Sequence, residues 1–147
     1  MKYTNEITIN LPLERVIELF DNPDNLAKWQ PGLISFEHLS GEPGHPGAKS
    51  KILYQMGKRR VEMIETVTKR NLPQEFSGTY ETKGVWNGIK NSFTALDSGQ
   101  TKWVSENEFK FSGFFMKMMA FLMPGAFKKQ SMQFMEYFKA FAEKEGR

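Results

Sequence analysis

The stretch FKKQSMQFMEYFKAF, residues 127–141, decides how this chain folds. One set of its side chains recurs at spacings of four, three, four and three, which is the period of one side of an α-helix. Lys, Gln and Glu fill most of the other sides. The pattern predicts a long C-terminal helix over about 125–144, with Phe134 and Phe138 in the core. The recurring set is Phe127, Ser131, Phe134, Phe138 and Phe141.

The segment before this helix reads FFMKMMAFLM, residues 114–123, and only Lys117 in it is polar. Spanning a bilayer takes roughly twenty apolar residues, so the segment is too short for a transmembrane helix. Pro124-Gly125 follows at once. Because Pro interrupts the hydrogen-bond ladder of a helix, we expect a kink or a break there.

Two sides of this segment are apolar, and we interpret it as a lid over a cavity. Met116, Met119 and Met123 share one side of a helix, which we expect to face inward, towards Phe109 and Phe127. The alternative is that both sides are plain core. The second side is expected near the surface, in transient contact with a membrane or with a second subunit of a homodimer, and it consists of Phe115, Met118 and Leu122.

Residues upstream of this segment alternate in the manner of strands. Residues 3–10 form the first strand, Pro12 opens a helix and a short helical turn covers 25–29. Six further segments are rich in Thr, Val, Tyr, Phe and Trp and are separated by short turns, which predicts antiparallel hairpins. These segments lie near 33–40, 48–57, 59–69, 75–83, 85–96 and 101–112.

The order of elements predicts an α+β fold. A seven-stranded antiparallel sheet has an apolar face to cover, and the C-terminal helix is the only element long enough to cover it. We therefore expect a strongly curved sheet wrapped around that helix, with two short helices after the first strand. One helix cannot touch the whole concave face, so a gap should remain between sheet and helix.

Length and composition narrow the class of protein. We expect residues 1–147 to form one domain, which at this length buries enough surface to need no disulfide or metal. The absence of cysteine and the polar, alternating N-terminus favour a cytoplasmic protein. The net charge is +3 and the basic clusters are small and scattered, so we expect no nucleic-acid partner.

Four stretches of the sequence carry a resemblance to a known superfamily. The chain resembles the START-like (SRPBCC) helix-grip proteins, which include polyketide cyclases and dehydratases, lipid-transfer START domains and Bet v 1-like plant allergens. The resemblance implies a cavity between sheet and C-terminal helix that takes apolar or amphipathic small molecules, lipid-like or polycyclic. It rests on ITINLPLERVIELFDNPDNLAKWQPGL (7–33), GEPGHPGAKSKILYQM (41–56), VTKRNLPQEFSG (67–78) and SGQTKWVSENEFKFSGFF (98–115).

Most catalytic signatures are missing from the sequence. Two histidines, His38 and His45, and no cysteine leave no local metal-ligand spacing, so we expect no metal. Residues 47–50 resemble the end of a phosphate-binding loop, but alanine stands where that motif needs glycine before its lysine. The stretch also leads into a strand and not a helix, so we do not interpret it as a phosphate site. No serine lies in a G-x-S-x-G elbow, and we expect no cofactor.

Carboxylates are the best candidates for acid–base chemistry. Glu106 and Glu108 alternate with the aromatic face of the last strand, which predicts that both face solvent. Glu65 instead alternates with Val61, Met63 and Val67, which predicts that it points inward unless a bulge shifts the register. Burial would raise its pKa and suit it to proton transfer.

These considerations leave two main functions open. The first is binding or carriage of an apolar or amphipathic molecule, and the second is a cyclase, aromatase or dehydratase reaction in the same cavity. A protein-interaction module using 114–123 is a weaker third. The catalytic candidates are Tyr54, Glu65, Tyr80 and Asn91. The ligand-binding candidates are Trp29, Tyr54, Met56, Met63, Tyr80, Asn91, Phe93, Trp103, Phe109, Met116, Met119, Met123 and Phe127, although Trp29 is equally expected to pack a short helix on the sheet.

Overall fold

The computed structural model describes residues 1–146, except for the side chains of Phe115 and Pro124. Each predicted strand is present, with bounds within two residues of those expected. The elements are β1 Lys2–Ile9, α1 Leu13–Phe20, the 3-10 turn η1 Pro23–Asn25, α2 Leu26–Trp29, β2 Leu33–Ser40, β3 Lys49–Met56, β4 Arg59–Asn71, β5 Glu75–Thr82, β6 Val85–Ala95, β7 Thr101–Phe111, α3 Phe114–Leu122 and α4 Pro124–Glu145.

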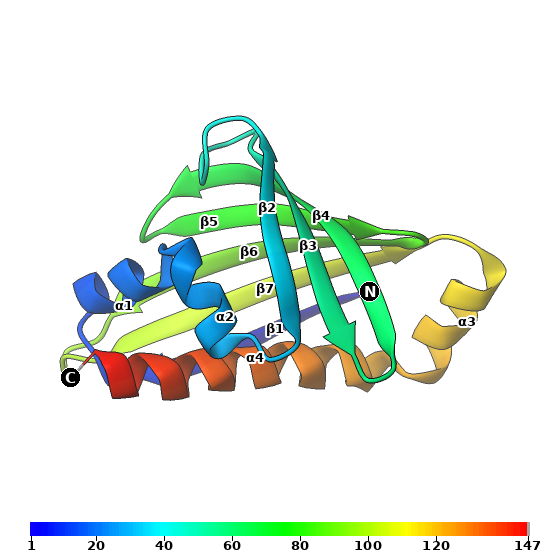
Figure 1. Cartoon of the computed structure of the whole chain (residues 1–147). Helices are drawn as coiled ribbons and strands as arrows, with labels where there is room; N and C mark the ends of the chain where they lie inside the picture. Colours follow the sequence, from blue (N-terminus) through cyan, green and yellow to red (C-terminus); the bar gives the residue numbers. More distant parts are fainter. Residues whose placement is uncertain (147) are drawn as a thin grey trace.

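The seven strands form one antiparallel sheet in the order β1-β7-β6-β5-β4-β3-β2. Strands β2 to β7 follow one another as hairpins, and β1 comes back to pair with β7, where Tyr3 lies opposite Asn107. The sheet curves over α4, which runs along β1 (Figure 1). This arrangement confirms the predicted curved sheet and long C-terminal helix.

The core lies where the C-terminal half of α4 meets the sheet. The Phe138 side chain is fully buried, with its ring 5.2 Å from Trp29 and 5.4 Å from Trp103 between centroids. Met135 and Ala142 are also buried, although the phenylalanine spacing did not identify them. Phe134 is only partly buried at the edge of the core, so its predicted place beside Phe138 is wrong in part.

Polar contacts hold the N-terminal half of α4 to β1. The Tyr3 hydroxyl donates to the Phe127 carbonyl oxygen at 3.2 Å and is also hydrogen-bonded to the Ser131 hydroxyl. The Asn5 amide donates to the Lys128 carbonyl oxygen at 3.1 Å. These contacts explain why a serine interrupts the phenylalanine seam at 131: a phenylalanine there would leave the part-buried Tyr3 hydroxyl with one partner fewer.

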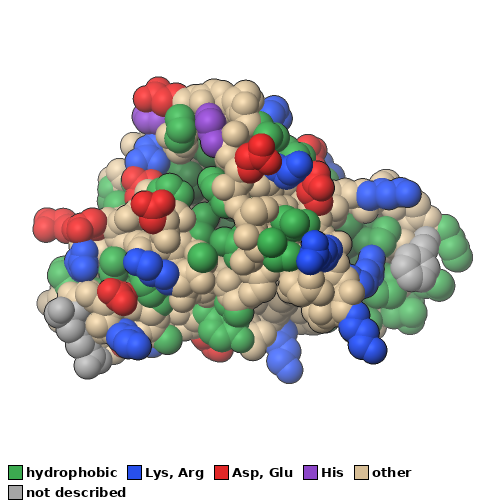
Figure 2. Space-filling model, viewed as in Figure 1, with side chains coloured by type: hydrophobic (Ala, Val, Ile, Leu, Met, Phe, Trp, Pro, Cys, Tyr) green, Lys and Arg blue, Asp and Glu red, His purple; other side chains and the backbone are tan. Residues whose placement is uncertain are grey.

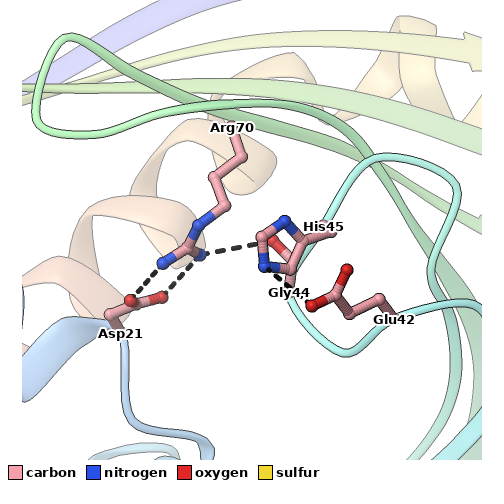
Figure 3. Close-up of polar contacts among 5 residues, drawn as sticks. All are labelled: Asp21, Glu42, Gly44, His45 and Arg70. Atoms are coloured by element: carbon pink, nitrogen blue, oxygen red, sulfur yellow. Dashed lines mark hydrogen bonds and ion pairs between the residues drawn. The ribbon is translucent and has the colours of Figure 1, made fainter.

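A polar cluster ties α1 to the β2–β3 loop and β4 (Figure 3). The Arg70 guanidinium donates to both carboxylate oxygens of Asp21, at 2.8 and 2.5 Å, and to the Gly44 carbonyl oxygen at 3.2 Å. In the same loop, the Nε2 atom of His45 lies 3.6 Å from the Oε1 atom of Glu42. Arg70 follows the β4 bulge between Val67 and Lys69, which turns its side chain towards α1.

Helix α3 lies beyond the end of the sheet, where it contacts β7 and α4 (Figure 1). Gly113 takes a φ of 85°, a conformation that favours glycine, at the point where the chain leaves β7. Met116 packs towards the body and lies close to Gly84. Met119 and Met123 are exposed, so the prediction that they face inward is wrong, because α3 leaves the sheet instead of closing over it. Phe115 was expected near the surface, but its side chain lies outside the described part of the chain.

Candidate functional site

A row of polar side chains crosses the concave face of the sheet. Directly paired residues of neighbouring antiparallel strands point to the same face. The pairing joins Ser50 of β3 to Glu65 of β4, Glu65 to Tyr80 of β5, and Tyr80 to Asn87 of β6. Ser50 and Asn87, at the ends of this row, are buried. The row therefore lies on the inner face, the same face that carries Ile52 and Val67.

Glu65 is the only carboxylate among the described residues of this row, and its surroundings favour the protonated form. Burial raises the pKa of Glu65, and hydrogen bonding with Tyr80 opposes part of the rise. No positive charge contributes to this balance among the described residues. The alternation that placed Glu65 inward is confirmed, because the bulge in β4 comes only after Val67. A neutral carboxylic acid in this place can both donate and accept a hydrogen bond.

Two tyrosines stand with Glu65. Burial raises the pKa of Tyr80 well above its ordinary value, and the charge and hydrogen bonding of Glu65 add to the rise. Burial and the charge of Glu65 likewise raise the pKa of Tyr54. Both phenols therefore remain protonated donors at neutral pH. The Tyr54 hydroxyl donates to Gln30 Oε1 at 2.6 Å.

A cavity of about 250 Å³ opens beside Tyr54, between α4 and the β3–β4 hairpin. Its walls combine the aromatic side chains of Tyr54, Phe134 and Tyr137 with amides from α4. The predicted ligand residue Met56 lines it as well. The full lining is Pro31, Tyr54, Gln55, Met56, Gly57, Gln130, Gln133, Phe134 and Tyr137.

Sequence reasoning missed the helical wall of this cavity. Gln130, Gln133 and Tyr137 lie three and four residues apart on one side of α4. That spacing was the available signal, but the prediction for this helix rested on its phenylalanine seam alone. Gln30, which binds Tyr54, carried no recognisable signal.

Three predicted ligand residues lie instead in the packed core. Trp29, Phe93 and Trp103 are each less than one-tenth exposed. The Phe93 and Trp103 rings stack 5.6 Å apart, and Phe20 of α1 packs edge-on against both. Phe93 and Trp103 were predicted from the strand face they share with the expected cavity, and Trp29 packs a short helix on the sheet, which was its alternative prediction. At this end of the sheet, α1 and α2 close the space that a ligand would need.

Asn91 is also engaged structurally. Its Oδ1 accepts from the Trp103 indole nitrogen at 2.9 Å, and its amide donates to the Phe76 carbonyl oxygen at 3.3 Å. The structure therefore brings together three of the four catalytic candidates, Tyr54, Glu65 and Tyr80, and places Asn91 in the support of the core. Met63 is partly buried and lies opposite Ile52 on the inner face.

The opposite end of the sheet has a second hollow. It has a volume of about 700 Å³ and lies between β7 and α3, with Phe109, Phe111 and Phe121 among its walls. The Phe127 ring packs 5.1 Å from Phe109 and 5.3 Å from Phe111. Phe109 and Phe127 are thus brought together as expected. Glu106 and Glu108 lie on the outer face, where they pair with Lys90 and Lys2.

Metal-ligating clusters and membrane-spanning helices are both absent from the described residues. No group of three or more His, Cys, Asp or Glu side chains there could hold a metal ion. No helix of this part of the chain is both long and apolar enough to cross a membrane.

Comparison with known proteins places the chain in a family. Residues 1–140 match the family described as polyketide cyclase / dehydrase and lipid transport. The chain belongs to this family. Membership confirms the resemblance inferred from the sequence, and the family includes both enzymes and carriers by its description. Among curated proteins, a sequence search finds no match.

Solved structures of low sequence identity share the fold of this family member. The Zhui aromatase/cyclase from Streptomyces sp. R1128 is 13% identical, with a TM-score of 0.81 over 100% of this chain and 96% of that one. A START superfamily protein from Mycobacterium smegmatis is 10% identical, with a TM-score of 0.78 over 97% of each chain. The crystal structure of Ara h 8.0201 is 15% identical, with a TM-score of 0.75 over 97% of each chain. At these identities the likeness concerns the fold alone.

Proposed function

We propose that this protein binds a hydrophobic or amphipathic small molecule on the concave face of its sheet. The polar end of the molecule would lie at Tyr54, Glu65 and Tyr80, and its apolar part along Met63 and the cavity beside Phe134. The observation that carries the proposal is Glu65 itself. A part-buried carboxyl with no cation beside it among the described residues destabilises a fold, so its presence on an inner face points to a use.

The family description, which names both cyclases and lipid transport, supports the same class of ligand. Lining of this kind, apolar walls with a few hydroxyl and amide groups, suits a ligand that is mostly apolar with one polar end. Because both tyrosines are protonated donors and burial favours the protonated form of Glu65, we expect that end to carry a hydrogen-bond acceptor such as a carbonyl or hydroxyl group.

A second candidate function is catalysis in the same place. The raised pKa of Glu65 favours it, because a general acid or base works best when its pKa lies near the working pH. Tyr80, paired with Glu65 across β4 and β5, would then hold or relay a proton at the substrate oxygen. Glu65→Gln should abolish such turnover while ligand binding persists.

Native mass spectrometry of the purified protein tests binding first. We expect a co-purified small molecule, or else saturable one-to-one binding of the neutral apolar dye Nile red. Met63→Trp adds bulk beside Ile52 and should weaken dye binding by about tenfold or more, which is about 1.4 kcal/mol. Leu39→Trp, at an exposed position of β2, is the matched control.

The result also decides between the two functions. A ligand that leaves unchanged after incubation identifies a carrier, and a change in its mass identifies an enzyme. A protein that carries no ligand and shows no saturable dye binding, or dye binding that Met63→Trp leaves intact, would refute the site.

A further inference from the structure

Helix α3 exposes an apolar surface that the interior does not use. Phe114, Phe121 and Leu122 are 82%, 84% and 67% exposed. Met118, Met119 and Met123 extend the same surface. We call these six residues the α3 patch. Figure 2 shows hydrophobic side chains gathered over α3 at one end of the molecule. Contiguous exposed apolar surfaces of this kind mark interaction sites.

The chain segment that carries the α3 patch has charged residues of one sign. Between Glu108 and Glu136 the chain has four lysines and no acidic residue. All four lysines are exposed, and basic side chains border the hydrophobic ones over α3 (Figure 2). Lys110 lies over the Trp86 ring, 4.7 Å from its centroid. The lysines are Lys110, Lys117, Lys128 and Lys129.

We propose that α3 docks the protein on a membrane surface rich in anionic lipid. The apolar side chains of the α3 patch would enter the boundary between headgroups and acyl chains, and the lysines would meet lipid phosphate and carboxylate groups. A nine-residue helix is about 14 Å long, which suits an element lying in the plane of the interface.

The charge pattern favours a membrane over a second copy of this chain. A symmetric dimer through the α3 patch would bring two identical sets of lysines together with no acidic partner among the residues of that stretch. An anionic bilayer neutralises the same lysines, because its negative surface potential attracts basic side chains that lie near it. The apolar patch and the lysines near it therefore fit an anionic membrane better than they fit a second copy of this chain.

The patch also adjoins the hollow between β7 and α3. Phe121 belongs to the patch and lines the hollow with Phe109 and Phe111. Docking would place the open side of this hollow at the bilayer. An apolar molecule could then pass from the lipid phase to the protein without crossing bulk water. This step is separate from the binding site at Glu65, so the membrane experiment can fail while that site stands.

Vesicle co-sedimentation tests the proposal. Wild-type protein should bind vesicles of phosphatidylcholine with about one-third phosphatidylserine and should bind pure phosphatidylcholine vesicles far less. Higher salt should weaken binding, because the Debye length shortens from about 10 Å at 0.1 M to about 3 Å at 1 M. The double variant Phe121→Ser/Leu122→Ser should lower the vesicle partition coefficient at least about tenfold. Lys117→Gln/Lys128→Gln should lower binding to the anionic vesicles only.

Matched controls remove similar side chains elsewhere. Ile34→Ser/Leu39→Ser removes exposed apolar side chains from β2, and Lys28→Gln/Lys144→Gln removes two exposed lysines, one from α2 and one from the last turn of α4. Both should bind vesicles like the wild type. Melting temperatures of the α3 variants should stay within a few degrees of the wild type, since the replaced side chains are already exposed.

Three results would overturn the proposal. Failure of the wild-type protein to bind either kind of vesicle would show that the α3 patch does not dock on membranes. Large losses of melting temperature in the α3 variants would show that the patch is core. A wild-type dimer in analytical ultracentrifugation that Phe121→Ser/Leu122→Ser dissociates, without vesicle binding, would assign the patch to self-association.

Discussion

Glu65 makes the stability of the molecule depend on pH in an unusual direction. Its pKa is raised in the folded state, so the folded protein holds a proton that the unfolded chain releases above its ordinary pKa near 4.5. Between these two values the folded state binds more protons, and the free energy of unfolding therefore falls as the pH rises. Below the ordinary pKa, both states are protonated and Glu65 has no such effect.

Glu65→Gln should remove this dependence. The variant should match the wild type in free energy of unfolding below about pH 4.5 and should exceed it above the folded pKa, by about 1.4 kcal/mol for each unit of the rise. Urea titrations from pH 4 to pH 8 measure the difference. Glu106→Gln, on the outer face, serves as control and should show no such divergence. A Glu65→Gln curve parallel to the wild type would show that the carboxyl is solvated.

Phe134 and Phe138 differ although they lie four residues apart on one helix. Phe138→Ala should cost about 3–5 kcal/mol, because the side chain is fully buried among aromatic rings. Phe134→Ala should cost less than half of that, because Phe134 already borders a cavity. Thermal or urea unfolding measures both. Equal losses would mean that the cavity beside Tyr54 is closed in solution.

At the scale of elements, the strands were predictable and the orientation of α3 was not. Strand limits follow from turn residues that stand in the sequence, such as Gly57 and Gly84, and alternation gave the face of Glu65 correctly. The α3 segment is apolar on nearly all sides, so periodicity could not tell its inner side from its outer side. Among the α3 methionines only Met116 packs towards the body, against Gly84, after Gly113 has turned the chain away from β7 with a positive φ.

The candidate site likewise contains one part that local sequence patterns predict and one part that they do not. Tyr54, Glu65 and Tyr80 were found from strand parity, because each strand residue has one of two faces. The wall contributed by Gln130, Gln133 and Tyr137 depends on how far α4 stands from the β3–β4 hairpin. That distance is set by the curvature of the sheet, which no local pattern encodes.

The polar cluster around Arg70 joins α1, the β2–β3 loop and β4, and it should contribute measurably to how they pack together. Arg70→Lys keeps the charge but cannot donate to both oxygens of Asp21 and to Gly44 together. We expect a loss of about 1 kcal/mol in the free energy of unfolding, since the pair is partly exposed. Arg15→Lys, which affects an exposed pair with Glu18, is the control. A double-mutant cycle with Asp21→Asn that shows no coupling would contradict the role of the cluster.

At the scale of the whole molecule, a ligand on the concave face would stabilise the fold. Binding to the folded state alone adds about 2.7 kcal/mol at a ligand concentration one hundred times Kd. Protein stripped of ligand by unfolding, extraction and refolding should therefore melt several degrees below protein as purified, and adding the extract back should restore the difference. Identical melting before and after stripping would argue against a resident ligand.

The pairing of β1 with β7 bears on how the protein is made. Lys2 lies opposite Glu108, so β1, which is synthesised before the other strands of this sheet, cannot pair with β7 until more than one hundred further residues have been synthesised. Until then Ile7 and Ile9 remain without the strand and helix that cover them, which exposes the nascent chain to chaperones or to aggregation. Folding of this protein should accordingly be late and concerted, with stalled chains that end before β7 sensitive to protease along their whole length.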